Sequence, residues 1–180
     1  MENLEAVKTK WVLDPAHSEL LFKVKHLMIS NVKGEFKNFR AEINGEDLES
    51  STVKAAIDSA SIFTNNEDRD NHLKSADFFD VENHKEITFV STVFKKEKKD
   101  NYLLTGKLSI KGVSKEVTLQ VEFGGINKDP WGNEKAGFSI TGKINRKDWG
   151  LNWNSALETG GVLVSDEVQI IGEVQFLKKV

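Results

Sequence analysis

Alternation of apolar and polar residues with a period of two is the feature that most constrains how this chain folds. Residues 117–123 place Val, Leu, Val and Phe at every second position, with Thr, Gln and Glu between them. Successive side chains of a β-strand point to opposite faces, so this stretch predicts a strand with one apolar and one solvated face. The alternation recurs at 20–28, 138–144 and 168–176, and more weakly at 39–43, 87–89 and 102–110. With 11–13 and 53–57, the pattern predicts roughly eight or nine strands.

Short polar turns join the predicted strands, at 44–47, 111–114 and 127–133. Strands that meet through such turns, without helices between them, are antiparallel. One segment, 65–76, departs from this pattern because it carries an asparagine cap and acidic residues in its first turn. It predicts the one short helix of the chain.

Many strands with a single helix indicate either a closed barrel or a sandwich of two sheets. The predicted strands are long, and Gly106, Gly142 and Gly172 stand inside them. Interior glycines mark sharp bends or positions where something approaches the backbone closely, which favours a barrel. A barrel of about eight strands can hold one small ligand and leaves no exposed edges. The pattern alone leaves the sandwich open.

Composition narrows the classes of partner. A formal net charge of −3 gives no reason to expect nucleic acid. The chain has no cysteine, which excludes disulfides and thiolate metal sites. No apolar stretch approaches the roughly 20 residues of a membrane-spanning helix, and residues 1–8 have early acids and no apolar signal-peptide core. The sequence therefore predicts a cytoplasmic protein without an integral membrane segment.

Five segments spread along the chain carry a family resemblance. They are 14–18 with Phe22, His26 and 34–39; 69–80; 108–117; 136–138 with 144–150; and 153–154 with 160–168. The most distinctive is 69–80, which reads Arg-Asp-Asn-His-Leu-Lys-Ser-Ala-Asp-Phe-Phe-Asp. In this order and spacing, from about residue 11 to 176, the chain resembles the YceI-like family of polyisoprenoid-binding, lipocalin-like proteins.

The resemblance implies an all-β fold, namely an extended, lipocalin-like antiparallel β-barrel with one short helix. This domain is expected over 11–180, after an N-terminal extension at 1–10. Its interior is expected to hold a polyisoprenoid or another long-chain apolar lipid, for binding, storage or transport without catalysis and without a further cofactor. A homodimer is compatible with the resemblance, but the sequence does not show one.

Such a ligand needs an apolar tube with a few polar groups at one end. Tail contacts are expected from residues of the inward-facing parity: Phe22, Val24, Phe89, Leu104, Leu108, Leu119, Val121, Phe138, Ile140 and Ile170. For each of them ordinary side-chain core is the alternative, because parity does not distinguish a cavity wall from packed core.

Head-group contacts are expected from 69–80 and 146–154. Arg69 and His72 lie three residues apart and share a helix face, and Arg69 can donate two parallel hydrogen bonds to a phosphate, with His72 as a further donor. The alternative for Arg69 is an ion pair with Asp70, Asp77 or Asp148 that pins the helix over the barrel mouth.

Further rim contacts are expected from Arg146, Trp149, Trp153 and Asn154. The segment 77–80 is expected to plug one end of the barrel with its two phenylalanine rings. The two tryptophans and Asn154 are expected at the opposite rim, with Gly160 and Gly161 as a mobile access loop. Structural packing is the alternative for the tryptophans.

His26 lies on the apolar face of its predicted strand, either as a hydrogen-bonded core residue or as a ligand contact. The histidines show no metal-binding spacing, so no metal site is predicted. Phosphate-loop, dinucleotide-binding and nucleophile-elbow motifs do not occur. Non-catalytic binding is therefore the main hypothesis, and two alternatives stay open. One is an enzyme on an apolar substrate with His26 or His72 as acid or base; the other is a structural or interaction barrel filled by its own side chains.

Overall fold

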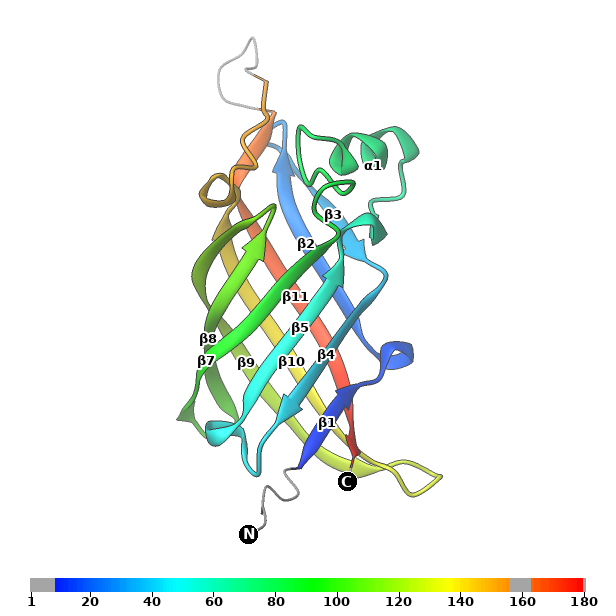
Figure 1. Cartoon of the computed structure of the whole chain (residues 1–180), viewed down its shortest axis with the longest axis vertical. Coiled ribbons are helices and arrows are strands. Elements are labelled where there is room, and N and C mark those ends of the chain that lie inside the picture. Colours follow the sequence, from blue (N-terminus) through cyan, green and yellow to red (C-terminus); the bar gives the residue numbers. More distant parts are fainter. Residues whose placement is uncertain (1–8, 156–162, 180) are drawn as a thin grey trace.

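The computed structural model describes residues 9–155 and 163–179 and shows an elongated antiparallel barrel with one helix at its upper end (Figure 1). The strands within these ranges are β1 (Lys10–Leu13), β2 (Glu19–His26), β3 (Ser30–Phe36), β4 (Phe39–Asn44), β5 (Thr52–Asp58), β6 (Ile62–Phe63), β7 (Glu86–Lys98), β8 (Asn101–Ile110), β9 (Val113–Lys128), β10 (Glu134–Asn145) and β11 (Val164–Lys179). The helix is α1 (Glu67–Lys74), and short 3-10 helices occur at η1 (Pro15–His17), η2 (Leu48–Ser50), η3 (Ser59–Ser61) and η4 (Arg146–Trp149).

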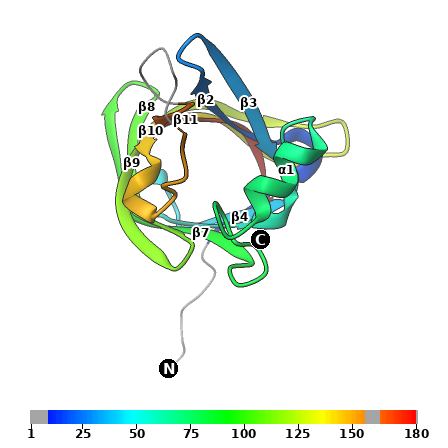
Figure 2. The ribbon, with the colours of Figure 1, turned by 90° about the horizontal axis from the view of Figure 1, so that it is seen from above.

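Strands β1, β4, β5, β7, β8, β9, β10 and β11 pair in that order and close a ring, because β1 pairs with both β4 and β11. The remaining strands, β2, β3 and β6, continue the sheet from β11. Figure 2 looks down the barrel and shows the strands around a common interior, with α1 at the rim. The predicted antiparallel barrel is confirmed, and closure of the ring excludes the sandwich.

The long strand β11 pairs with two strands in turn along one edge. Val164–Glu173 lie against β2, and Phe176–Lys179 lie against β1. At the junction between them, Ser18 Oγ accepts a hydrogen bond from Gln175 N at 3.0 Å. Strand β1 therefore completes the barrel at its lower end, whereas β2, β3 and β6 form this part of the wall at the upper end.

Asp14 ties this junction to β10. Its Oδ2 accepts a hydrogen bond from Lys135 Nζ at 2.8 Å and lies 2.9 Å from His17 Nδ1. The Asp14 and Lys135 side chains are only 13% and 19% exposed, respectively. The hydrogen bond from Lys135, helped by those from His17 and Ala16, holds the pKa of the Asp14 carboxyl below its ordinary value despite the opposing effect of burial.

Asp14→Asn is expected to lower the free energy of unfolding by about 1–2 kcal/mol at pH 7, because charge-assisted hydrogen bonds are lost. A carboxyl whose pKa is lowered by folding stabilises the protein above its unfolded-state pKa of about 3.9. That contribution disappears as the pH falls through the lower folded-state pKa. Urea unfolding at pH 7 and at about pH 3 should therefore show a difference from the parent protein that shrinks at low pH.

The matched control for this prediction is Glu97→Gln, at an exposed position near the end of β7. Its unfolding free energy is expected to follow that of the parent protein at both pH values. An equal loss for the two variants at pH 7 would show that Asp14 has no special role at the junction.

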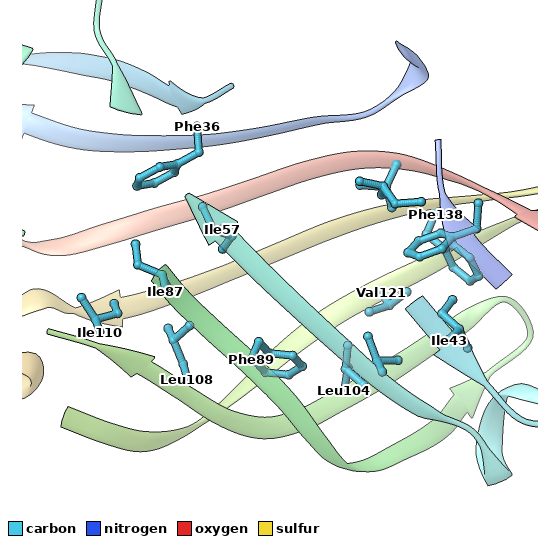
Figure 3. Packing of buried hydrophobic residues seen from close by; sticks show 14 of the residues in the cluster. Phe36, Ile43, Ile57, Ile87, Phe89, Leu104, Leu108, Ile110, Val121 and Phe138 are labelled. Carbon is cyan, nitrogen blue, oxygen red and sulfur yellow. The ribbon is translucent and has the colours of Figure 1, made fainter. Parts of the chain in front are cut away.

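The lower end of the barrel is filled by its own side chains. The Phe138 ring lies 5.3 Å from that of Phe123 and 5.9 Å from that of Phe176, between ring centroids. Figure 3 shows Ile43 and Val121 pointing into the same region of the interior. These residues come from β4, β9, β10 and β11, so the barrel core is contributed by opposite walls. Their burial is worth about 25 cal/mol per Å² of apolar surface.

Two of the interior glycines lie where another group approaches the backbone. A Cβ atom added at Gly106 would lie 2.5 Å from Val90 O, opposite an irregularity in the β7–β8 pairing. A Cβ atom at Gly142 would lie 2.5 Å from the Leu119 side chain. The prediction for these two glycines is confirmed. At Gly172 the added atom would make an ordinary contact of 3.5 Å with Ile140, so a close approach does not explain this glycine.

Helix α1 begins after Asn66, whose side chain accepts a hydrogen bond from Arg69 N at 2.9 Å. Its first turn contains three acidic residues, which interact favourably with the positive end of the helix dipole. The predicted helix at 65–76 is therefore confirmed, with a shorter extent. Its position at the upper end of the barrel brings its side chains to the open end of the interior.

Candidate binding cavity

A cavity of about 640 Å³ extends from the upper end of the barrel down to the packed side chains of the lower end, where Leu13 and Phe176 are among its lining residues. Volumes of about 300–1,000 Å³ are usual for pockets that enclose small ligands. Its wall is formed by inward-facing side chains of strands all around the barrel, and these side chains are almost all apolar. The polar side chains of the lining lie at one end of the cavity, which we call the mouth. They are Lys25, His26, Thr64, Asn66, Asp68, Arg69, His72 and Arg146.

Eight of the predicted tail contacts line this cavity: Phe22, Val24, Phe89, Leu104, Leu108, Leu119, Ile140 and Ile170. The other two, Val121 and Phe138, do not. They are buried in the aromatic core below the cavity. Their assignment to the cavity wall was wrong, because parity gives the face of a strand but not the height along the barrel.

Two small residues of the wall were missed by the sequence reasoning. Ala41 of β4 and Ala55 of β5 are cross-strand partners, and both line the cavity. Ala55 is also paired with Phe89 of β7. The sequence did contain a signal for this part of the cavity, namely two alanines at inward positions of neighbouring predicted strands. Small side chains at such positions leave space inside a barrel.

Arg146 is buried at the mouth and is bonded to backbone carbonyls. Its Nε donates to Ser165 O at 2.9 Å, and its Nη1 donates to Leu151 O at 2.6 Å and to Trp153 O at 2.9 Å. Its Nη2 donates to Val164 O at 3.3 Å. Burial lowers the pKa of the Arg146 guanidinium, and nearby Asp166 opposes this effect. Arg146 thus holds the segment after η4 against the start of β11.

The side chain of Arg69, in contrast to that of Arg146, is hydrogen-bonded to a single one of the described residues, Thr64. Its Nε donates to Thr64 Oγ1 at 2.8 Å and its Nη2 donates to Thr64 O at 2.9 Å. Within the described residues Arg69 forms no ion pair with Asp70, Asp77 or Asp148, so the expected alternative is wrong. Asp70 accepts from Thr64 instead, and Asp77 contacts His72. A guanidinium has five N–H donors. The two bonds to Thr64 use two of them, so Arg69 keeps donors for a ligand at the mouth.

His72 joins the two sides of the mouth. Its ring contacts those of Phe78 and Trp153 edge to face, with centroid distances of 5.2 Å and 4.7 Å. Its Nε2 lies 2.9 Å from Asp77 Oδ2. The Phe78 and Trp153 rings are themselves 5.5 Å apart. The expectation of two opposite rims was therefore wrong, because the segment after α1 and the segment after η4 meet at one rim.

Trp149 and Asn154 do not line the cavity. The indole of Trp149 is almost fully buried, and its Nε1 donates to Leu108 O at 2.8 Å. Asn154 Nδ2 donates to Val164 O at 2.7 Å, and its Oδ1 accepts from Val164 N at 3.0 Å. Both residues fix the 146–155 segment to the barrel wall. Gly160 and Gly161 lie outside the described residues.

His26, at the end of β2, does line the cavity mouth, where it is the pairing partner of Val164. Across residues 9–155 and 163–179, no group of three His, Asp or Glu side chains is arranged to hold a metal ion. Within the same ranges, no helix has the length and apolar character needed to cross a membrane.

These features place the chain among closed antiparallel β-barrels that have an internal apolar cavity and a polar mouth. The profile of the YceI-like domain matches residues 11–176, and the chain belongs to this family. UPF0312 proteins of Staphylococcus epidermidis and Staphylococcus aureus are 46% and 44% identical to it over 171 residues. Each alignment covers 93% of this chain and 97% of the relative.

Solved structures support the same assignment. A YceI protein of Campylobacter jejuni is 37% identical and superposes with a TM-score of 0.74, over 88% of this chain and 91% of that one. BcnA of Burkholderia cenocepacia is 25% identical with a TM-score of 0.77, over 91% and 98% of the two chains. A polyisoprenoid-binding domain from Saccharophagus degradans, at 13% identity and a TM-score of 0.65, shares the fold over 94% of this chain and 98% of that domain.

Proposed function

We propose that this protein binds a long-chain apolar lipid inside the barrel, most simply a polyisoprenoid, for storage or transport without chemical change. The observation that carries the proposal is the cavity of about 640 Å³, which is apolar along its walls and polar only at its mouth. Each methylene group that enters such a cavity contributes about 0.8 kcal/mol. The fold shared with a polyisoprenoid-binding domain supports the choice of ligand class.

The polar end of the ligand is assigned to Arg69 and His72 at the mouth. Arg69 keeps N–H donors after its two bonds to Thr64, whereas four N–H···O contacts engage Arg146 with backbone carbonyls. Arg69 therefore suits the head group better than Arg146 does. Acceptor oxygens on the lipid head, neutral or anionic, match the donors that Arg69 offers.

Native mass spectrometry of the purified protein, followed by organic extraction and lipid mass spectrometry, tests the proposal. A stoichiometric adduct that is recovered as an unaltered prenyl or fatty-chain lipid is the expected result. If the protein remains bare after incubation with prenyl lipids, the barrel is self-filled and the proposal is wrong. If the lipid is recovered chemically changed, the protein is an enzyme, with His26 and His72 as the residues to replace first.

His72→Ala is expected to speed the release of a bound lipid by about tenfold. The substitution removes the contacts that join α1 to Trp153 across the mouth, and two edge-to-face contacts are worth about 0.5–1.5 kcal/mol each. The measurement is the rate at which a fluorescent prenyl lipid passes from the loaded protein to acceptor vesicles. His84→Ala is the control, since His84 also lies near an aspartate but does not line the cavity. Equal release rates for both variants would contradict closure by His72.

A further inference from the structure

The turn between β2 and β3 presents three apolar side chains to solvent at the upper end of the barrel. Leu27, Met28 and Ile29 are 39%, 50% and 81% exposed. The alternation at 20–28 predicted that Met28 would face inward, but β2 ends at His26 and the turn follows. Leu27 and Met28 adopt positive φ angles of 55° and 62°, so the chain reverses there and the strand parity ends.

This apolar turn is continuous with the wall of the cavity. Val24 and His26 of β2 and Val32 of β3 line the cavity on either side of the turn. Leu27 N donates to Leu163 O at 2.9 Å, and Leu163 also lines the cavity. A lipid that leaves the mouth on this side would therefore pass from the cavity wall by way of His26 to the exposed turn.

The hairpin behind the turn carries positive charge. Between Glu19 and Glu35 the ionisable residues are His26 and three lysines, namely Lys23, Lys25 and Lys33. Lys23 and Lys33 are cross-strand partners, and Lys25 stands opposite Asn31, two residues nearer the turn. Each lysine near an anionic membrane surface adds to the attraction. Apolar side chains next to lysines also hold amphipathic helices at the membrane interface.

We propose that the β2–β3 hairpin docks on an anionic lipid bilayer, with Ile29 and its neighbours in the interface and the lysines at the head groups. In this arrangement the hairpin side of the cavity mouth, and not the acidic first turn of α1, faces the membrane, so the bilayer is the source or the acceptor of the cavity lipid. The role of the bilayer as lipid source or acceptor rests on the proposed lipid-binding function, whereas the docking of the hairpin does not depend on it.

The opposite end of the barrel provides a contrast. Trp131 is also 81% exposed, in the turn between β9 and β10. Its backbone N donates to the carboxylate of Asp129, so an acid lies within this turn, whereas the β2–β3 hairpin has no acid between Glu19 and Glu35. Exposure alone therefore does not define the docking surface. The combination of apolar turn, lysines and cavity mouth defines it.

Co-flotation with vesicles tests the docking. The probes are vesicles of phosphatidylglycerol mixed with phosphatidylcholine, and vesicles of phosphatidylcholine alone. The parent protein is expected to float with the anionic vesicles, and Ile29→Asp is expected to bind them about tenfold more weakly. Trp131→Asp, the control of equal exposure, is expected to bind like the parent. Lys25→Glu combined with Lys33→Glu is expected to weaken binding to the anionic vesicles only.

Two results would overturn the docking: no flotation of the parent protein with anionic vesicles, or equal binding by the Ile29→Asp and Trp131→Asp variants. Lipid binding is measured separately: each variant is loaded with a prenyl lipid from detergent, and native mass spectrometry reports the fraction of protein that carries it. Ile29→Asp that still takes up lipid stoichiometrically but no longer floats supports docking by the hairpin. A parent protein that floats but never carries lipid retains the docking and rejects the proposed function.

Discussion

Ala55→Trp is expected to abolish stoichiometric lipid binding while the barrel remains folded. Ala55 faces the cavity from the middle of β5, between Ala41 of β4 and Phe89 of β7. An indole at this position projects into the space that the lipid tail would use. If it displaces three methylene groups, each worth about 0.8 kcal/mol, affinity falls by about 60-fold. Titration with a fluorescent prenyl lipid measures the change, and native mass spectrometry reports the loss of the adduct.

The control for this variant is its neighbour in the sequence. Ala56→Trp places the same ring on the outer face of β5, between Arg40 of β4 and Thr88 of β7. This variant is expected to bind lipid like the parent protein. Circular dichroism and urea unfolding should show that both variants fold. Undiminished binding by folded Ala55→Trp would mean that the ligand does not occupy the cavity.

Arg146→Met is expected to lower the free energy of unfolding by about 3–5 kcal/mol, because four backbone carbonyls around the buried guanidinium lose their donors. For a chain of this size the melting temperature should fall by about 10 °C. Arg146→Lys restores the charge but not the planar fork of donors, so it should recover only part of the loss. Urea and thermal unfolding provide the measurement.

Arg40→Met is the matched control for Arg146. Arg40 lies on the outer surface, 2.9 Å from Glu86, with 73% of its side chain exposed. Exposed ion pairs contribute at most about 1 kcal/mol, so this variant should unfold close to the parent protein. If Arg146→Met lost no more stability than Arg40→Met, the carbonyl cluster would not hold the 146–155 segment in place.

Much of the barrel could be predicted from the sequence because its signal is local. Alternation along 117–123 or 168–176 depends only on the pleat of one strand, and it placed Leu119 and Ile170 correctly on the inner face. The same signal contains nothing about height along the barrel. Val121 has the parity of Leu119, yet it belongs to the lower core, because the register of β9 against β8 and β10 decides which end it reaches.

The mouth was less predictable because it is assembled from distant segments. His72 and Trp153 are far apart in the sequence, and only closure of the barrel brings their rings to 4.7 Å. The role of Arg146 was also hidden, since its partners are backbone carbonyls, which every residue possesses. Arg69 was expected either to reach a ligand or to pair with an acid. Its contact with Thr64 was not expected, since a threonine carries no charge to indicate a partner.

The divided pairing of β11 has a consequence for local stability. Its lower part completes a ring through β1, whereas its upper part is followed by β2, β3 and the two-residue strand β6. The upper wall thus ends in a short ladder of two residue pairs, Glu35 with Phe63 and Phe36 with Ile62. Because a two-pair ladder has few backbone hydrogen bonds to break, we expect its amide hydrogens to exchange with solvent earlier than those of the lower ring.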